Sequence, residues 1–95
     1  MNNADLINEA KSYLRISTTS VDEEIEQTIN ACLADLSNAG IKKIDTDDAL
    51  IRQAIKLYLK SMFGYDKEAE RYAKAYEYLK ISLNLSSSYN AESEV

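Results

Sequence analysis

The sequence predicts an all-α fold, a small bundle of about four helices around one central apolar helix. Apolar residues recur at helical spacing along most of the chain, proline is absent, and polar or glycine-containing breaks separate the periodic stretches. Helices are expected at roughly 5–16, 21–38, 47–63 and 66–84, in a single domain of residues 1–85. The polar segment 86–95 has no periodicity and is expected to be a disordered tail.

A polar break at residues 17–20 separates the first two helices. Ser20 followed by Glu23 has the form of a capping box and predicts Ser20 as the N-cap of the second helix. Cys32 lies on the apolar face of this helix and is expected to be a small buried hydrophobe, and Gly40 is expected to end the helix in a left-handed conformation. The first turns carry four acids, and the helix dipole alone accounts for at least three of them. These acids are Asp22, Glu23, Glu24 and Glu26.

The central helix, residues 47–63, is the most apolar long stretch of the chain. Its apolar positions run from Leu50 to Phe63 at i, i+3, i+4, i+7 spacing, so it is expected to be buried over more than half its circumference. Thr46 is expected to cap its start, and Gly64 is expected at the C′ position after its end. Three basic residues at i, i+4 spacing should form one stripe on the face left to solvent. They are Arg52, Lys56 and Lys60.

The last helix shows a regular a/d seam, which should pack against the core. The seam consists of Tyr65, Ala69, Tyr72, Tyr76, Leu79 and Leu83. Tyr78 and Ile81 lie off this seam and should be partly exposed, which makes Tyr78 a candidate interface residue. Residues 41–45 form a short segment that is expected to be a loop, with strand pairing between chains as the alternative.

Composition excludes several classes of site. With no histidine and one cysteine, the chain has no disulfide, no His/Cys zinc site and no Ser/His or Cys/His nucleophile pair. Only two glycines are present, so a glycine-rich phosphate loop is absent. We therefore expect no enzyme activity, no cofactor and no metal. No signal peptide and no apolar run long enough to span a bilayer is seen, which predicts no membrane partner and a protein made in a reducing cytoplasm.

The charge distribution points to protein partners. A net charge of −5 argues against sequence-independent binding to nucleic acid. Residues 1–50 hold ten acids and four bases, whereas residues 51–95 hold six acids and seven bases. Such a division usually reflects two solvated faces, but in a protein that stacks head to tail it would supply complementary edges. A small core without a disulfide or metal also favours self-association.

The order of these elements resembles that of the small head–tail connector proteins of long-tailed phages and prophages, also described as DNA-packaging or head-completion proteins. The resemblance rests on three stretches and covers roughly residues 5–83: Tyr13-Leu14-Arg15-Ile16, Asp22-Glu23-Glu24-Ile25, and the apolar helix from Leu50 to Phe63. In the family, the third helix is commonly followed by an Asn/Asp-Arg turn and a variable loop. Here Gly64 leads almost directly into a long tyrosine-rich helix.

The resemblance implies a structural virion protein made in the host bacterial cytoplasm and located at the virion neck. Its partners would be further copies in a ring of about a dozen, the portal protein, and a tail-completion or stopper protein. The candidate interface residues are Asp22, Glu23, Glu24, Glu26, Arg52, Lys56, Lys60 and Tyr78. Two alternatives remain: a non-viral adaptor or regulatory module that dimerises through the 65–83 seam, and a small DNA-binding protein, which the net charge disfavours.

Overall fold

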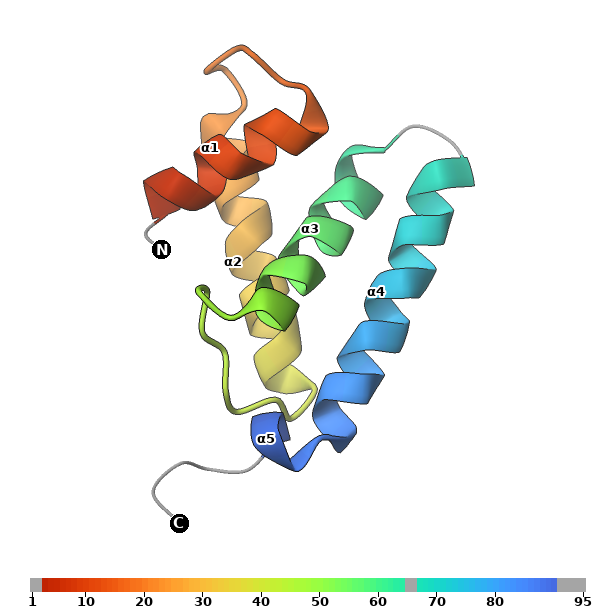
Figure 1. Ribbon diagram of the computed structural model, residues 1–95. Helices are drawn as coiled ribbons and strands as arrows, with labels where there is room; N and C mark the ends of the chain where they lie inside the picture. The colour runs from red at the N-terminus through yellow and green to blue at the C-terminus, as the bar shows by residue number, and fades with distance from the viewer. Residues whose placement is uncertain (1–2, 65–66, 91–95) are drawn as a thin grey trace.

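The computed structural model describes residues 3–64 and 67–90, and all regular secondary structure in these ranges is helical (Figure 1). Four main helices are followed by one short turn of helix, which confirms the all-α prediction. The helices are α1 (Asn3–Leu14), α2 (Asp22–Asn38), α3 (Ala49–Phe63), α4 (Lys67–Leu85) and α5 (Ser87–Asn90). The loop 41–45 has no regular secondary structure, as expected.

Helix α3 is the centre of the bundle, with α2 and α4 on either side of it and α1 crossing near the start of α2 (Figure 1). Its inward face is fully buried through Ile51, Ala54, Ile55 and Leu59. Burying each large apolar side chain contributes about 1.5–3 kcal/mol to folding. The other helices and the 41–45 loop complete one core, formed by Leu6, Ala10, Ile25, Ile29, Cys32, Leu36, Ile41, Tyr76 and Leu83.

Two apolar residues of α3 that were expected on its buried face are exposed. Leu50 is 44% exposed in the first turn, at the edge of that face. Met62 is 58% exposed although it follows Leu59 on the buried side, because a groove between α2 and α3 remains open at this end of α3. The expectation of burial was therefore wrong at both ends of the helix.

Two helices end in the same hydrogen-bonded motif, in which the residue after the C-cap takes a left-handed conformation. After α2 this residue is Gly40 (φ 102°), as predicted, and the N–H of Ile41 donates to the carbonyl of Leu36 at 3.2 Å. After α1 it is Arg15 (φ 59°), and the N–H of Ile16 donates to the carbonyl of Lys11 at 2.9 Å. A non-glycine residue is disfavoured in this conformation, so Arg15 is a strained position.

Three predicted caps were wrong. Within the described chain, the N-cap of α2 is Val21 without a side-chain cap. Both groups of Ser20 that a capping box uses are bonded to Thr18 in the polar turn: the Ser20 hydroxyl accepts from the Thr18 hydroxyl, and the Ser20 N–H donates to it. The N-cap of α3 is Asp48 rather than Thr46, and its carboxylate accepts from the N–H groups of Leu50 and Ile51 at 3.0 and 3.2 Å. Gly64 is extended (φ −82°) rather than left-handed.

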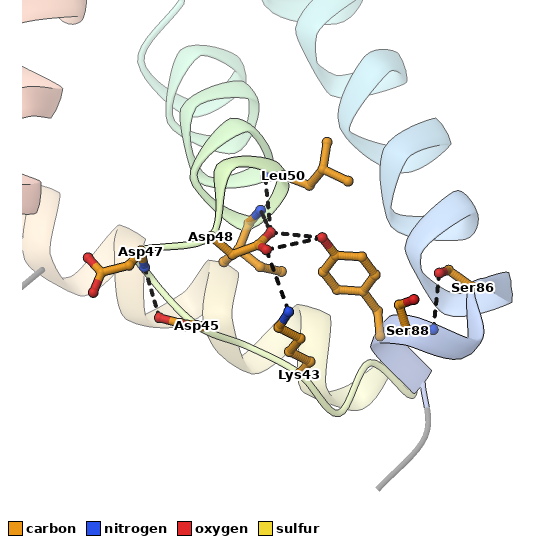
Figure 2. A network of polar contacts seen from close by, with 9 residues as sticks. Lys43, Asp45, Asp47, Asp48, Leu50, Ser86 and Ser88 are labelled. Atoms are coloured by element: carbon orange, nitrogen blue, oxygen red, sulfur yellow. Dashed lines mark hydrogen bonds and ion pairs between the residues drawn. The ribbon is translucent and has the colours of Figure 1, made fainter. Parts of the chain in front are cut away.

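The segment after α4 is ordered as far as Asn90, in contrast to the disordered tail expected from residue 86; residues 91–95 lie outside the described residues. Tyr89 holds this segment to the loop before α3. Its hydroxyl donates to the Asp48 carboxylate at 3.0 Å, and its carbonyl accepts from the N–H groups of Lys42 and Lys43 at 2.6 and 3.0 Å. The ammonium of Lys43 also approaches Asp48 at 3.8 Å (Figure 2) and lies 5.4 Å from the centroid of the Tyr89 ring.

Replacing Arg15 with glycine is expected to stabilise the protein. Relief of the left-handed strain is worth about 1–2 kcal/mol, and the added freedom of the unfolded chain costs about 0.4–1 kcal/mol, so the net gain should be about 0.5–1 kcal/mol. Urea unfolding measures this difference. Ser12→Gly, at an exposed position in α1, is the control and should instead lose about 0.5 kcal/mol. A destabilised Arg15→Gly variant would contradict the assignment.

Removing α5 is expected to release the loop before α3. In a chain that ends at Ser86, the N–H groups of Lys42 and Lys43 lose their acceptor on Tyr89, so their hydrogen exchange should accelerate by about tenfold or more. A chain that ends at Asn90 keeps this contact and serves as the control. Equal exchange rates in the two chains would show that α5 does not hold the loop.

Candidate subunit interface

The acidic start of α2 divides into an internal and an external part. Asp22 forms an ion pair with Lys11 of α1 at 2.9 Å, which fastens the start of α2 to α1. Glu23 and Glu24 are exposed, and Glu23 accepts a 3.5 Å hydrogen bond from Gln27 of its own helix. Glu26 is half-buried. The exposed charge available to another molecule is therefore concentrated at Glu23 and Glu24.

The three basic residues of α3 are half-buried and contact neighbouring helices, so the expected stripe faces solvent only in part. The guanidinium of Arg52 forms an ion pair with Glu9 of α1. The ammonium of Lys56 lies 5.4 Å from the ring centroid of Tyr13, also in α1, and that of Lys60 lies 4.9 Å from the ring of Tyr72 in α4. Cations over aromatic rings are stabilising, so these side chains help α3 to hold both neighbours.

Tyr78 is 78% exposed, as predicted, and it belongs to a larger apolar surface. Ile81 (58% exposed) and Leu85 (78% exposed) lie three and seven residues further along α4, on the same face. Arg71 and Lys74 continue this face toward the start of α4, with side chains 76% and 77% exposed. We call these five residues the α4 ridge. Their steps of 3, 4, 3 and 4 form a second a/d pattern that the sequence analysis missed beside the inward seam.

An open groove lies between α2 and α3 near the C-terminal end of α3, with a volume of about 370 Å³. Tyr58, Met62 and Phe63 of α3 supply its apolar lining. Helix α2 supplies Glu24, Gln27, Thr28 and Ala31 at i, i+3, i+4, i+7 spacing. We call this the α2/α3 groove. It combines an apolar floor with an acidic residue at one end, and among the candidate residues only Glu24 lines it.

A polar cluster joins α2 to α4. Asp35 accepts hydrogen bonds from the Tyr76 hydroxyl at 2.7 Å and from the Lys80 ammonium at 2.8 Å. These two donors, Lys80 first, hold the pKa of Asp35 below its ordinary value. Burial raises the pKa of the Cys32 thiol to about 12, and Cys32 lies 3.9 Å from the Tyr76 hydroxyl. Cys32 is thus a protonated, buried core residue, as predicted, and has no nucleophilic character at neutral pH.

The described residues offer neither a cluster of metal ligands nor a membrane-spanning helix. They contain no group of three or more histidine, cysteine, aspartate or glutamate side chains that could hold a metal ion. None of the described helices is long and apolar enough to cross a membrane.

A comparison with protein-family models matches residues 6–90 to the family described as phage connector protein. The match includes nearly all of α1 and the whole of α2 to α5. The chain belongs to the phage connector protein family. Searches of curated proteins and of solved structures found no match. The family supports a connector-type structural role in a phage, and its members are structural rather than enzymatic.

In this connector protein, the seam that the alternative dimer would use packs within the chain. Tyr76 and Leu83 are buried, and the Tyr76 ring meets that of Tyr58 in α3 edge-on, with centroids 5.0 Å apart. Tyr65, at the start of the seam, lies outside the described residues. A dimer through this seam would have to separate α4 from α3, at the cost of the buried core. The outward face of α4 is the one available to another molecule.

The Asp35–Lys80 pair predicts an acid-sensitive contribution to the connector's stability. Because the folded-state pKa of Asp35 is lowered, this contribution is complete above the unfolded pKa of about 3.9 and is lost as pH falls through the folded value. Asp35→Asn should reduce the free energy of unfolding at pH 7 by at most about 1 kcal/mol, since the pair is partly exposed. Urea unfolding should show this gap shrinking between pH 4 and pH 2. Glu77→Gln, at the more exposed partner of Lys80, should have a smaller effect; a pH-independent gap for Asp35→Asn would contradict the assignment.

Proposed function

We propose that this protein is a head–tail connector that assembles as a ring beneath the portal at the virion neck. The ring, of about a dozen copies, would extend the DNA channel and present a docking surface for a tail-completion or stopper protein. The observation that carries the proposal is the family match over residues 6–90. It spans both the helical core and the outward surfaces described above.

The surface of the chain supports a role in assembly. Large exposed apolar residues gather on the outward face of α4, and such patches on small soluble domains commonly mark interaction sites. A closed ring requires a heterologous contact, in which two different surfaces of the same chain meet. The α4 ridge and the α2/α3 groove are two such surfaces.

The charge of the chain supports a role around DNA that does not include tight binding to it. The net charge is −5, and the three basic residues of α3 contact α1 and α4. A channel lined by such chains would repel the phosphate backbone, so DNA would pass without strong attachment.

The remaining candidate residues have two roles in this proposal. Tyr78, Glu23 and Glu24 would contact another subunit or the portal directly. Arg52, Lys56 and Lys60, with Asp22, would act indirectly, because they hold α1, α3 and α4 in the geometry that presents those surfaces. Glu26 is half-buried in the first turns of α2 and would join Glu23 and Glu24 as a contact residue.

Solution mass tests the proposal. Light scattering behind a sizing column, over a protein concentration series, is expected to give a closed species of about a dozen copies, either alone or after addition of a purified phage portal ring. Bovine serum albumin in place of the chain is the control for the portal arm. A stable dimer at all concentrations that does not bind the portal ring would contradict the proposal and favour the adaptor module.

A further inference from the structure

We propose that the α4 ridge of one copy docks into the α2/α3 groove of a second copy, so that the chain associates head to tail. This inference rests on the proposed function for its place in a ring, but the contact itself is argued from two surfaces of the chain. It commits to one occupant of the groove: the outward face of α4 from an identical chain.

The ridge cannot fill the groove of its own chain. Tyr76 and Leu83 of α4 are buried against the core, and the ridge lies on the opposite side of the same continuous helix. It therefore points away from α3, whereas the groove opens between α2 and α3. Both surfaces are left open in one copy, so each copy can donate one ridge and receive another.

The apolar parts of the two surfaces match in kind. On the ridge, Tyr78 and Ile81 project from adjacent turns of α4. In the groove, Met62 is 58% exposed, and Tyr58 and Phe63 are half-buried beside it. Docking removes these side chains from water together, and a tyrosine that enters an apolar pocket with its hydroxyl at a polar rim is a common interface anchor.

The two surfaces also carry opposite charges beside their apolar parts. Lys74 is four residues before Tyr78, a distance of about 6 Å along the helix axis. Glu24 lines the groove, and Glu23 is exposed next to it. With Tyr78 over Met62 and Phe63, Lys74 can reach Glu24. The pairs that Lys74 and Arg71 now form with Glu70 and Glu68 are exposed contacts within α4, which are worth little and are easily exchanged.

A symmetric contact between two α4 ridges matches less well. In a parallel pair, Arg71 and Lys74 would each face their own copies, which places like charges together. In an antiparallel pair centred on Tyr78, Arg71 would face Leu85, which leaves the basic end without an acidic partner. The groove offers both an apolar floor and an acid, so the head-to-tail arrangement is favoured.

The test uses two aspartate variants, one on each surface, with full-length chains. Ile81→Asp alters the ridge and Met62→Asp alters the groove; both side chains are more than half exposed, so the fold should tolerate the changes. Leu50→Asp, at an exposed apolar residue in the first turn of α3 outside both surfaces, is the matched control. Sedimentation velocity should show association weakened by about tenfold or more for each surface variant and unchanged for the control.

Mixing the two variants separates head-to-tail docking from symmetric docking. The Met62→Asp chain keeps an intact ridge and the Ile81→Asp chain keeps an intact groove, so an equimolar mixture should form a dimer and stop there. A symmetric ridge contact would instead leave Met62→Asp as competent as the unaltered chain. That result, or a mixture that forms no dimer while the unaltered chain associates, would overturn the proposal.

Disulfide trapping covers the case in which the unaltered chain is a monomer in solution. A Tyr78→Cys chain mixed with a Met62→Cys chain should cross-link between residues 78 and 62 faster than it cross-links to a Leu50→Cys control chain. The natural Cys32 is fully buried and does not compete. Equal rates for the two mixtures would overturn the proposal.

The two proposals can fail separately. If Ile81→Asp and Met62→Asp still form the closed species or still bind the portal ring as the unaltered chain does, the docking contact is wrong and the connector function stands. If residues 62 and 78 cross-link selectively but the chain neither closes into a ring nor binds a portal, the contact stands and the connector function is wrong.

Discussion

The burial of α3 is the constraint on which the rest of this domain depends. Ile51, Ala54, Ile55 and Leu59 occupy one side of the helix and are removed from water by α1, α2 and α4. One helix thus supplies the surface on which three others pack, and no layer of the core forms without it. Removing a methylene or more from such a position leaves a cavity, so the centre of α3 tolerates change less well than any exposed turn.

The basic side chains of α3 also contribute to the packing of this helix against its neighbours. A helix that contacts three neighbours has little surface left for solvent, so Arg52, Lys56 and Lys60 are half-buried and contact α1 and α4. Each keeps its charged end near a carboxylate or an aromatic ring while its aliphatic part covers apolar surface. The basic residues of the central helix therefore serve the packing of the domain first.

The helices could be predicted from the sequence because their apolar spacing is regular and no proline interrupts it. The N-caps could not, because several hydroxyl and carboxyl side chains compete at each helix start. Asp48 rather than Thr46 caps α3, since its carboxylate reaches the N–H groups of both Leu50 and Ile51. The order of the segment around Tyr89 was also beyond prediction. It depends on Asp48, 41 residues away, and local polarity alone favours disorder.

For the candidate interface, the sequence predicted which apolar residues are exposed, but it did not predict which side chains the charged residues contact. Tyr78 and Ile81 were predicted to leave the seam of α4, and both are exposed. The charged candidates were chosen by spacing along one helix, which says nothing of a partner on another, such as Glu9 for Arg52 or Lys11 for Asp22. Met62 shows a different limit of prediction. It lies on the apolar face of α3 as expected, but that part of the face borders the open groove, so Met62 is exposed.

The two faces of α4 explain how so small a chain can be both folded and available for assembly. The inward seam buries Tyr76 and Leu83 against α3, and Asp35 of α2 holds α4 at Tyr76 and Lys80. Because these contacts fix the rotation of α4 about its axis, the outward face is fixed too, and Tyr78, Ile81 and Leu85 are presented together. A partner that binds this face meets a preorganised surface and does not bear the cost of ordering it. The core of the domain therefore determines which apolar residues remain for another molecule.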